Sequence, residues 1–388
     1  MKARLGSIML SVSILLFITH CTNTSGTKFN PGHYVAVGPF YEISEINYLD
    51  EPAVQGVNKR YLWRTLEPER GVYDFASIEH DLAYLEEHDK QLIVFLMDMS
   101  FSEKSALPGY LSEYELHADG GGFWPVRWHP VMIERFLALG KALGERFDAH
   151  PNFEGLAIQE SSLGITEESY STFGYTAEKY RDALIAILTG LQDALPNSHV
   201  FWYSNFLPDN DGYLRQVADA IEASGVFMGG PDILPYRRFL GRVSYPMYEE
   251  YRDRLTLFCS AQGDSYKHHK NDVSVDEQEP IHAEGYLTME EIFLFARDSL
   301  HVRYLFWDYE YEITEQGQRT YNDAIEVIRK YPTFNDSTGP LGSTAMWKRD
   351  LGVVAMIVCG VVVVTSGVAW AVRSRLRRRN GGRSTKIG

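Results

Sequence analysis

Eight short apolar segments alternate with amphipathic segments between residues 33 and 330, and this alternation constrains the fold more than any other feature of the chain. The apolar segments are continuous rather than alternating, which is typical of strands buried on both faces in a parallel sheet. Between most of them, apolar residues recur at the three- and four-residue spacing of helices. The predicted strands are residues 33–38, 56–63, 91–98, 153–159, 199–205, 225–230, 254–261 and 302–308.

A strand followed by a helix, repeated eight times, predicts the α/β class and a (β/α)8 barrel. Clear helical patterns occupy residues 76–89, 131–147, 176–195, 211–223 and 288–300. The weakest parts of the prediction are a first helix within residues 41–54 and the segment between strands six and seven. A doubly wound open sheet is the alternative, although no GxGxxG or phosphate-binding loop follows any strand. Residues 28–334 are long enough for one such barrel domain.

The two ends of the chain differ in composition from this domain. Residues 1–27 begin with Lys2 and Arg4 and continue through an apolar run, as an export signal does. Cys21 stands where a lipoprotein cysteine would lie, and ordinary cleavage or an uncleaved anchor are the alternatives.

The C-terminal region predicts a single membrane span. Residues 351–372 carry no charge, and 22 helical residues at about 1.5 Å each reach about 33 Å, enough for a bilayer core. Residues 335–350 are expected to form a linker. The basic tail, residues 373–388, favours the cytoplasmic side, so the barrel domain is expected outside a membrane. A sorting tail that is later clipped is the alternative.

The net charge of the chain disfavours some partners, and its cysteine content excludes a disulfide within the domain. Seven Lys or Arg and no acid lie in residues 373–388, so the net charge of −15 becomes −22 for the rest of the chain. A strongly acidic domain disfavours DNA, RNA or other polyanions. Only Cys259 of the three cysteines lies in the barrel domain, so no disulfide within that domain is expected.

Active sites of (β/α)8 barrels lie at the carboxyl ends of the strands, so the last residues of each predicted strand and those just past it are the first candidates. Many of these residues are polar or acidic, although strand ends are generally more polar than strand middles. They are Tyr41, Glu42, Arg64, Glu67, Asp98, Ser100, Gln159, Glu160, Asn205, Asp232, Gln262, Asp264, Trp307, Asp308 and Glu310.

Residues 61–96 resemble the second and third strand-helix units of clan A glycoside hydrolases, the cellulase-like and β-galactosidase-like barrels. The matching residues are Trp63, Arg64, Glu67, Pro68, Gly71, Tyr73, Asp74 and Phe75. In that clan the fourth strand ends in an Asn-Glu pair whose glutamate is the general acid and base. The resemblance therefore implies this role for Glu160, with Gln159 in place of the asparagine that bonds a sugar hydroxyl.

Glycosidic cleavage explains why a carboxyl group is needed there. One carboxylic acid protonates the departing oxygen, and a second carboxylate attacks the sugar or activates water. Partial burial at the end of an apolar strand can raise the pKa of the first. The alternative is that Glu160 forms a structural ion pair with Arg64 or another cation.

The chain departs from the clan at the seventh strand, where the family has a nucleophilic glutamate. The nearest residue here is Gln262, a neutral amide. Asp264, Asp308 and Glu310 are the other carboxylates that could act. Two alternatives follow: the second carboxylate comes from an unusual position, or the barrel binds sugar without cleaving it.

Carbohydrate is the expected partner, because sugar rings stack on aromatic faces and their hydroxyls bond polar side chains. The expected binding residues are Arg64, Asp98, Gln159, Asn205, Tyr236, Gln262 and Trp307, the last because the clan often places a tryptophan under the sugar. The long loop at residues 101–130 is expected to form one wall of the site. No cofactor is expected, and His268 and His269 lack the spacing of a metal site.

Overall fold

The computed structural model describes residues 27–117, 121–208, 211–266, 287–309 and 321–333. Within them, eight parallel strands close into a barrel in the order β1-β10-β9-β8-β7-β6-β3-β2. The closed sheet confirms the (β/α)8 prediction and excludes the open doubly wound sheet. The strands are β1 (Gly32–Val37), β2 (Val54–Leu62), β3 (Gln91–Met97), β6 (Phe153–Ile158), β7 (His199–Tyr203), β8 (Phe227–Gly230), β9 (Leu257–Ala261) and β10 (Tyr304–Asp308).

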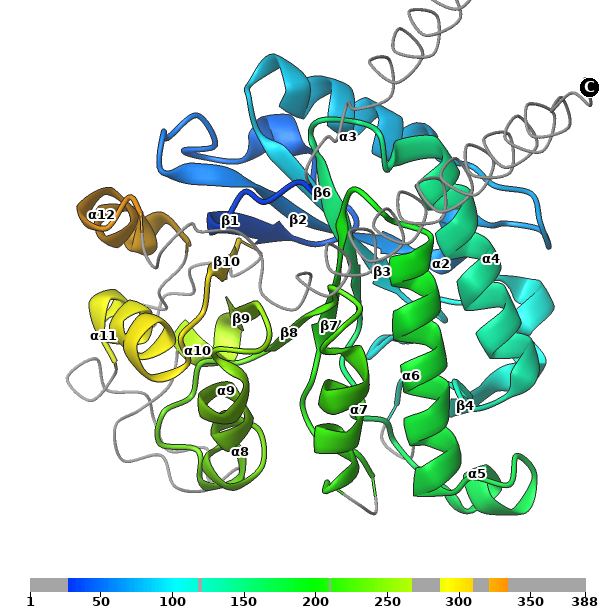
Figure 1. Cartoon of the computed structure of the whole chain (residues 1–388). Coiled ribbons are helices and arrows are strands. Elements are labelled where there is room, and N and C mark those ends of the chain that lie inside the picture. The colour runs from blue at the N-terminus through cyan, green and yellow to red at the C-terminus, as the bar shows by residue number, and fades with distance from the viewer. Residues whose placement is uncertain (1–26, 118–120, 209–210, 267–286, 310–320, 334–388) are drawn as a thin grey trace, which may run out of the picture.

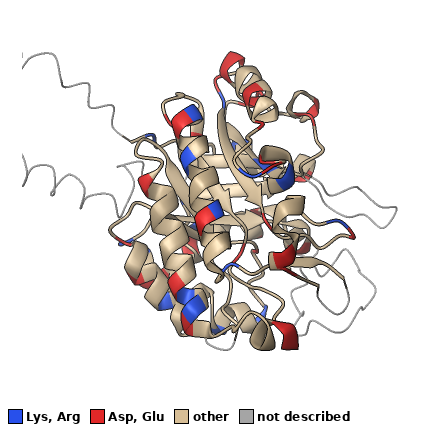
Figure 2. Cartoon of the chain, turned by 90° about the vertical axis from the view of Figure 1, so that its right-hand side faces the viewer, with Lys and Arg blue, Asp and Glu red and all other residues tan. Residues whose placement is uncertain are grey.

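Helices surround the barrel (Figure 1). The long ones coincide with the predicted patterns: α3 (Ala76–Glu87), α4 (Pro130–Phe147), α6 (Ala177–Asp193) and α7 (Tyr213–Ile221). The last part of the barrel is covered by α8 (Arg238–Arg242), α9 (Tyr245–Tyr251), α11 (Met289–Leu294) with the π-helical turn η4 (Phe295–Ser299), and α12 (Tyr321–Lys330). Figure 2 shows acidic and basic residues interspersed on the helices.

The predicted first helix is absent. Residues 41–54 contain only the 3-10 turn η1 (Ile43–Glu45), and Tyr48 takes a φ of 58°, which no α-helix accommodates. Ile43, Ile46 and Leu49 are all buried at a strict three-residue spacing. The apolar residues therefore anchor a loop against the barrel rather than forming the stripe of a helix.

Large rings fill the inside of the barrel. They come from alternate strand residues, and glycine or alanine on neighbouring strands makes room for them. A Cβ at Gly229 would lie 2.5 Å from the ring of Phe258. The residues of this inner cluster are Tyr34, Ala36, Ile93, Phe95, Ala157, Phe201, Tyr203, Phe227, Phe258, Tyr304 and Phe306.

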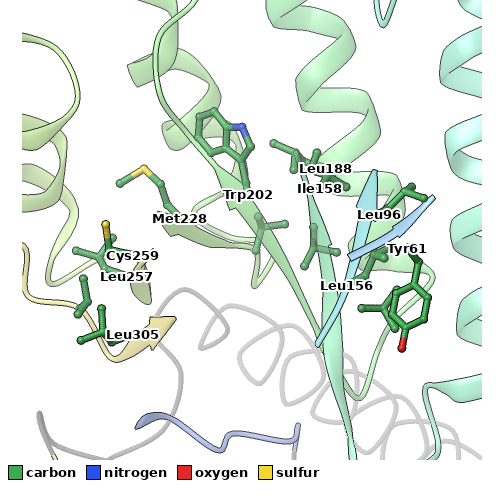
Figure 3. Packing of buried hydrophobic residues seen from close by; sticks show 14 of the residues in the cluster. Tyr61, Leu96, Leu156, Ile158, Leu188, Trp202, Met228, Leu257, Cys259 and Leu305 are labelled. Atoms are coloured by element: carbon green, nitrogen blue, oxygen red, sulfur yellow. The ribbon is translucent and has the colours of Figure 1, made fainter. Parts of the chain in front are cut away.

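A second and larger apolar layer lies between the sheet and the helices. Figure 3 shows part of it, with Ile158, Trp202, Met228 and Cys259 on the outer face of four strands. Cys259 is buried and unpaired, as expected for the single cysteine of the domain. The two layers fix the barrel so that its strand ends form a rigid rim.

Short elements follow the strands at their carboxyl ends. These are α2 (Trp63–Leu66), η2 (Gly109–Tyr114), the antiparallel pair β4 (Glu115–His117) and β5 (Phe123–Pro125), α5 (Glu167–Ser171) and α10 (Gly263–Tyr266). Figure 1 shows β4, α5 and α8 in the lower part of the view. None of the helices within the described ranges combines the length and apolarity of a membrane span, and the predicted span at 351–372 lies outside those ranges.

Candidate active site

Glu160 lies just past the end of β6 and is partly exposed at the rim. Its Oε2 accepts hydrogen bonds from Asn205 Nδ2 at 2.6 Å and from Ser162 Oγ at 2.7 Å. Among the described residues, no lysine or arginine forms an ion pair with this carboxylate, and Oε1 accepts no hydrogen bond. The structural ion pair with Arg64 is therefore not what holds Glu160.

A buried ion pair fixes the backbone that carries Glu160. The Arg127 guanidinium donates to both carboxylate oxygens of Asp98, at 2.6 and 2.7 Å, and both side chains are fully buried. Arg127 also donates to the backbone oxygen of Glu160 at 2.7 Å. Tyr180 donates to the backbone oxygen of Ser161 at 2.7 Å. Asp98 was expected to contact sugar, but its carboxylate serves this internal clamp.

Gln159 joins two strand ends. Its Oε1 accepts the backbone N–H groups of Asp98 and Met99, each at 2.7 Å, and the side chain is only 6% exposed. This oxygen is therefore occupied within the protein, so the expected bond to a sugar hydroxyl could come only from the amide nitrogen. The two bonds hold the ends of β3 and β6 together beside Glu160.

Asn205, just past the end of β7, forms a hydrogen bond with the Glu160 carboxylate. It is 8% exposed, and its backbone N–H donates to Ser161 Oγ at 3.0 Å. Its Nδ2 donates to Glu160, whereas none of the described residues donates to its Oδ1. A buried acceptor without a donor costs about 1–3 kcal/mol, so a ligand hydroxyl that donates to Oδ1 would be stabilised.

Asp232, just past the end of β8, is coupled to Glu160. Burial raises the pKa of Asp232 to about 7, and the negative charges of Glu160 and Asp264 act in the same direction, while Arg237 opposes them. The sequence placed Asp232 among the strand-end residues but gave it no role, because the resemblance directed attention to the seventh strand. The available sequence signal was that Asp232 follows the second strand after the one that precedes Glu160.

Gln262 and Asp264 follow β9, and Asp264 belongs to α10 and is exposed. The backbone oxygen of Gln262 accepts Ser265 N at 2.9 Å. Ser265 Oγ accepts the backbone N–H of Ile233 at 3.0 Å. The α10 turn is thereby tied to the loop that carries Asp232, and the charge of Asp264 lies close enough to affect that residue.

The residues at the end of β10 differ in their surroundings. Asp308 is 7% exposed, and its backbone oxygen accepts Tyr266 OH at 3.1 Å. Trp307 is fully buried between sheet and helices, where its Nε1 donates to His33 Nδ1 at 3.0 Å. This corrects the expectation of a sugar platform, because no face of the Trp307 indole is open to a ligand here. Glu310 lies outside the described residues.

The motif that carries the family resemblance has a structural role in this chain. The Glu67 carboxylate is fully buried and accepts Trp63 Nε1 at 3.0 Å, the backbone N–H of Gly71 at 2.8 Å and the guanidinium of Arg135. Arg64 is partly exposed, and its backbone N–H donates to Ala106 O at 2.9 Å. No contact between Arg64 and Glu160 is found among the described residues.

Exposed aromatic side chains gather on the loops of the rim. Tyr236, a predicted binding residue, is 44% exposed after β8. Phe101 is 66% exposed and packs edge-on against Trp124 at 5.2 Å, and Phe206 packs in the same way against Phe239 at 5.4 Å. The phenylalanines were not predicted, because only tryptophan and tyrosine were considered as sugar-binding aromatic residues.

The described residues include no group of three His, Cys, Asp or Glu side chains arranged to hold a metal ion. His268 and His269 lie outside those residues.

Comparison with known structures shows similarity to glycoside hydrolase barrels. A β-galactosidase from Bacillus circulans sp. alkalophilus matches with a TM-score of 0.52 and 10% identity, over 78% of this chain and 56% of that chain. A β-galactosidase from the Antarctic haloarchaeon Halorubrum lacusprofundi matches with a TM-score of 0.51 and 13% identity, over 80% of this chain and 59% of that one. This chain thus spans somewhat more than half of each enzyme.

These matches confirm the resemblance to glycoside hydrolase barrels at the level of the fold. No protein-family model matches the chain, and no curated protein matches its sequence. At 10% and 13% identity, similarity to a solved structure establishes the architecture and leaves activity to be argued from the site.

Proposed function

We propose that the protein is a glycoside hydrolase that acts on an oligosaccharide or polysaccharide, with Glu160 as the general acid/base. The observation that carries the proposal is the setting of the Glu160 carboxylate at the carboxyl ends of the strands. One of its oxygens is fixed by Asn205 and Ser162, and the other accepts no hydrogen bond from the described residues. In a (β/α)8 barrel this is the position of reacting groups.

The chemistry suits such a carboxyl group. Hydrolysis of a glycosidic bond needs proton transfer at the departing oxygen and at the attacking water. A carboxylate held through one oxygen keeps a defined orientation while the other oxygen exchanges a proton with the substrate or with water. The buried pair of Asp98 and Arg127 supports this geometry, because Arg127 fixes the backbone oxygen of Glu160.

A second candidate function is a carbohydrate-binding barrel without catalysis. The observation that favours it is Gln262, which follows β9 where a catalytic carboxylate is expected from the family resemblance. The exposed rings of Phe101 and Tyr236 would contribute to sugar binding in either case.

The Glu160→Gln variant separates the two functions. Full-length protein, Glu160→Gln and the surface control Glu87→Gln, on the exposed side of α3, are incubated with a panel of polysaccharides and β-linked oligosaccharides, and reducing ends are measured. We expect turnover by the wild type and by Glu87→Gln, and a loss of about 100-fold or more in Glu160→Gln. Binding without turnover by the wild type would support the non-catalytic barrel. Equal turnover by all three proteins would remove Glu160 from the mechanism.

We also propose that residues 351–372 anchor the barrel at the outer side of a membrane. The support is the run of 22 uncharged residues followed by the basic tail. Alkaline carbonate extraction tests this: the full chain should stay with the membrane fraction, and a chain ending at residue 350 should be released. Release of both would contradict the anchor.

A further inference from the structure

Three consecutive barrel strands are each followed by a polar residue at the rim. Glu160 follows β6, Asn205 follows β7 and Asp232 follows β8, and β7 pairs with both of its neighbours. Asn205 donates to Glu160 at 2.6 Å and so links the first two positions directly. The third position, Asp232, has no part in the function argued above.

The loop that carries Asp232 is held by three neighbouring elements. The backbone oxygen of Asp232 accepts hydrogen bonds from Tyr245 OH at 3.3 Å and from Cys259 Sγ at 3.3 Å. The next residue, Ile233, donates its N–H to Ser265 Oγ at 3.0 Å. Asp232 is therefore positioned by α9, β9 and α10 rather than standing on a free loop.

The charged surroundings of Asp232 favour its neutral form. Burial and the carboxylates of Glu160 and Asp264 raise its pKa to about 7, although the Arg237 guanidinium opposes them. Among the described residues, Tyr245 and Cys259 also face Asp232; burial raises the pKa of both groups, so both are neutral at pH 7. At neutral pH a large fraction of Asp232 therefore carries a proton, and the Glu160 carboxylate is close enough to affect the pKa of Asp232.

An independent feature points to a ligand at the same place. Among the described residues, none donates a hydrogen bond to Asn205 Oδ1, although Asn205 is only 8% exposed. The same amide is directed at Glu160 through Nδ2. A hydroxyl donor from a bound sugar would satisfy this acceptor and would lie between the β6 and β8 ends.

We propose that Asp232 is the second catalytic carboxyl group: it protonates the departing glycosidic oxygen, while Glu160 accepts the proton of the attacking water. This inference rests on the proposed glycoside hydrolase function and divides the acid and base roles within it. It supplies the carboxyl group that Gln262 cannot provide.

The step balances with water as the only other reactant. The bond between the anomeric carbon and the glycosidic oxygen breaks, and that oxygen takes the proton of Asp232. A water oxygen forms the new bond to the anomeric carbon, and its proton passes to Glu160. Exchange with solvent then returns a proton to Asp232 and removes one from Glu160.

The strand positions favour inversion at the anomeric carbon. Neighbouring strands lie about 4.7–4.9 Å apart, so β6 and β8 are separated by roughly 9–10 Å across β7. Inverting enzymes hold their carboxyl groups about 6.5–9.5 Å apart to admit water, whereas retaining enzymes hold them about 5–5.5 Å apart. Asp264 is exposed on α10, and its charge acts on Asp232 in the same direction as that of Glu160.

The test compares substrates that differ only in the leaving group. Full-length wild type, Asp232→Asn and Asp232→Ala are assayed on phenyl and 2,4-dinitrophenyl β-galactosides, β-glucosides, β-mannosides and β-xylosides, using the sugar that the wild type cleaves fastest. Dinitrophenolate departs without protonation, whereas phenolate does not. We expect kcat/KM to fall about 100-fold or more for the phenyl glycoside and less than about 10-fold for the dinitrophenyl glycoside.

The controls keep the two proposals separable. Asp253→Asn makes the same chemical change at an exposed carboxylate and should leave both rates unchanged. Equal losses on the two substrates in both folded Asp232 variants, or no loss on either, would overturn the role of Asp232 while Glu160→Gln still tests the hydrolase. A wild type that cleaves none of the glycosides or polysaccharides would instead overturn the proposed function itself.

Discussion

Replacing Asp232 by asparagine should stabilise the folded protein at pH 8 but not at pH 4. The pKa of Asp232 is raised from 3.8 to about 7, so its ionisation is disfavoured in the folded state. Its contribution to stability is fully present below pH 3.8 and is lost as the pH rises through 7. Asparagine keeps the size and removes the ionisation, so the variant escapes this loss.

The size of the effect follows from the pKa. A tenfold change in proton affinity corresponds to about 1.4 kcal/mol, which sets an upper limit of about 4 kcal/mol for a carboxyl that titrates at about 7 instead of 3.8. Asp232 is not sealed from water, and screening reduces this to about 1–3 kcal/mol. Such a loss of stability at a catalytic group is a common trade-off between stability and activity.

Guanidinium unfolding followed by tryptophan fluorescence measures the difference. The free energy of unfolding is determined for wild type and Asp232→Asn at pH 4 and pH 8, and the gain of the variant should be about 1–3 kcal/mol larger at pH 8. In a Glu160→Gln background the gain should shrink, because the charge of Glu160 is one of its causes. A gain that is equal at the two pH values would show that ionisation of Asp232 does not destabilise the fold.

Three further substitutions, together with the surface control Arg146→Met, test the scaffold of the site by the same unfolding measurement. Arg127→Met should lower the free energy of unfolding by about 3–5 kcal/mol, because it leaves Asp98 buried and unpaired. Arg146→Met breaks an exposed ion pair and should lower it by less than about 1 kcal/mol. Similar losses in the two variants would show that burial of the pair is unimportant. Gln159→Ala should cost about 2–4 kcal/mol by leaving two backbone N–H groups without an acceptor, and a cost below about 1 kcal/mol would contradict the clamp. Glu67→Ala should cost about 3–5 kcal/mol because a buried arginine loses its partner, and an unchanged midpoint would disprove that structural role.

The barrel could be predicted from the sequence because continuous apolar strands and amphipathic helices are local patterns. The register of a strand is also local, and it explains the error at Trp307. Tyr304 and Phe306 point into the barrel, so the residue between Phe306 and Asp308 must face the helices. Alternation along β10 already placed Trp307 away from the rim, but the family resemblance was given more weight.

The candidate site was predictable only in part. The strand-end rule found Glu160 and Asn205, since both follow strands directly. It could not find Arg127, because this side chain comes from a long loop and pairs with Asp98 29 positions away. Nor could it assign a proton to Asp232, because that depends on burial and on charges brought close by three separate elements.

The stereochemistry of the first product tests most directly the central claim that a glycosidic bond is cleaved by water between Glu160 and Asp232. Proton NMR spectra recorded during cleavage of a β-glycoside by the full-length protein distinguish the two anomers before they equilibrate. The α-anomer should appear first, and Glu160→Gln should form no product on the same timescale. First appearance of the β-anomer would contradict the assignment of the two carboxyl groups.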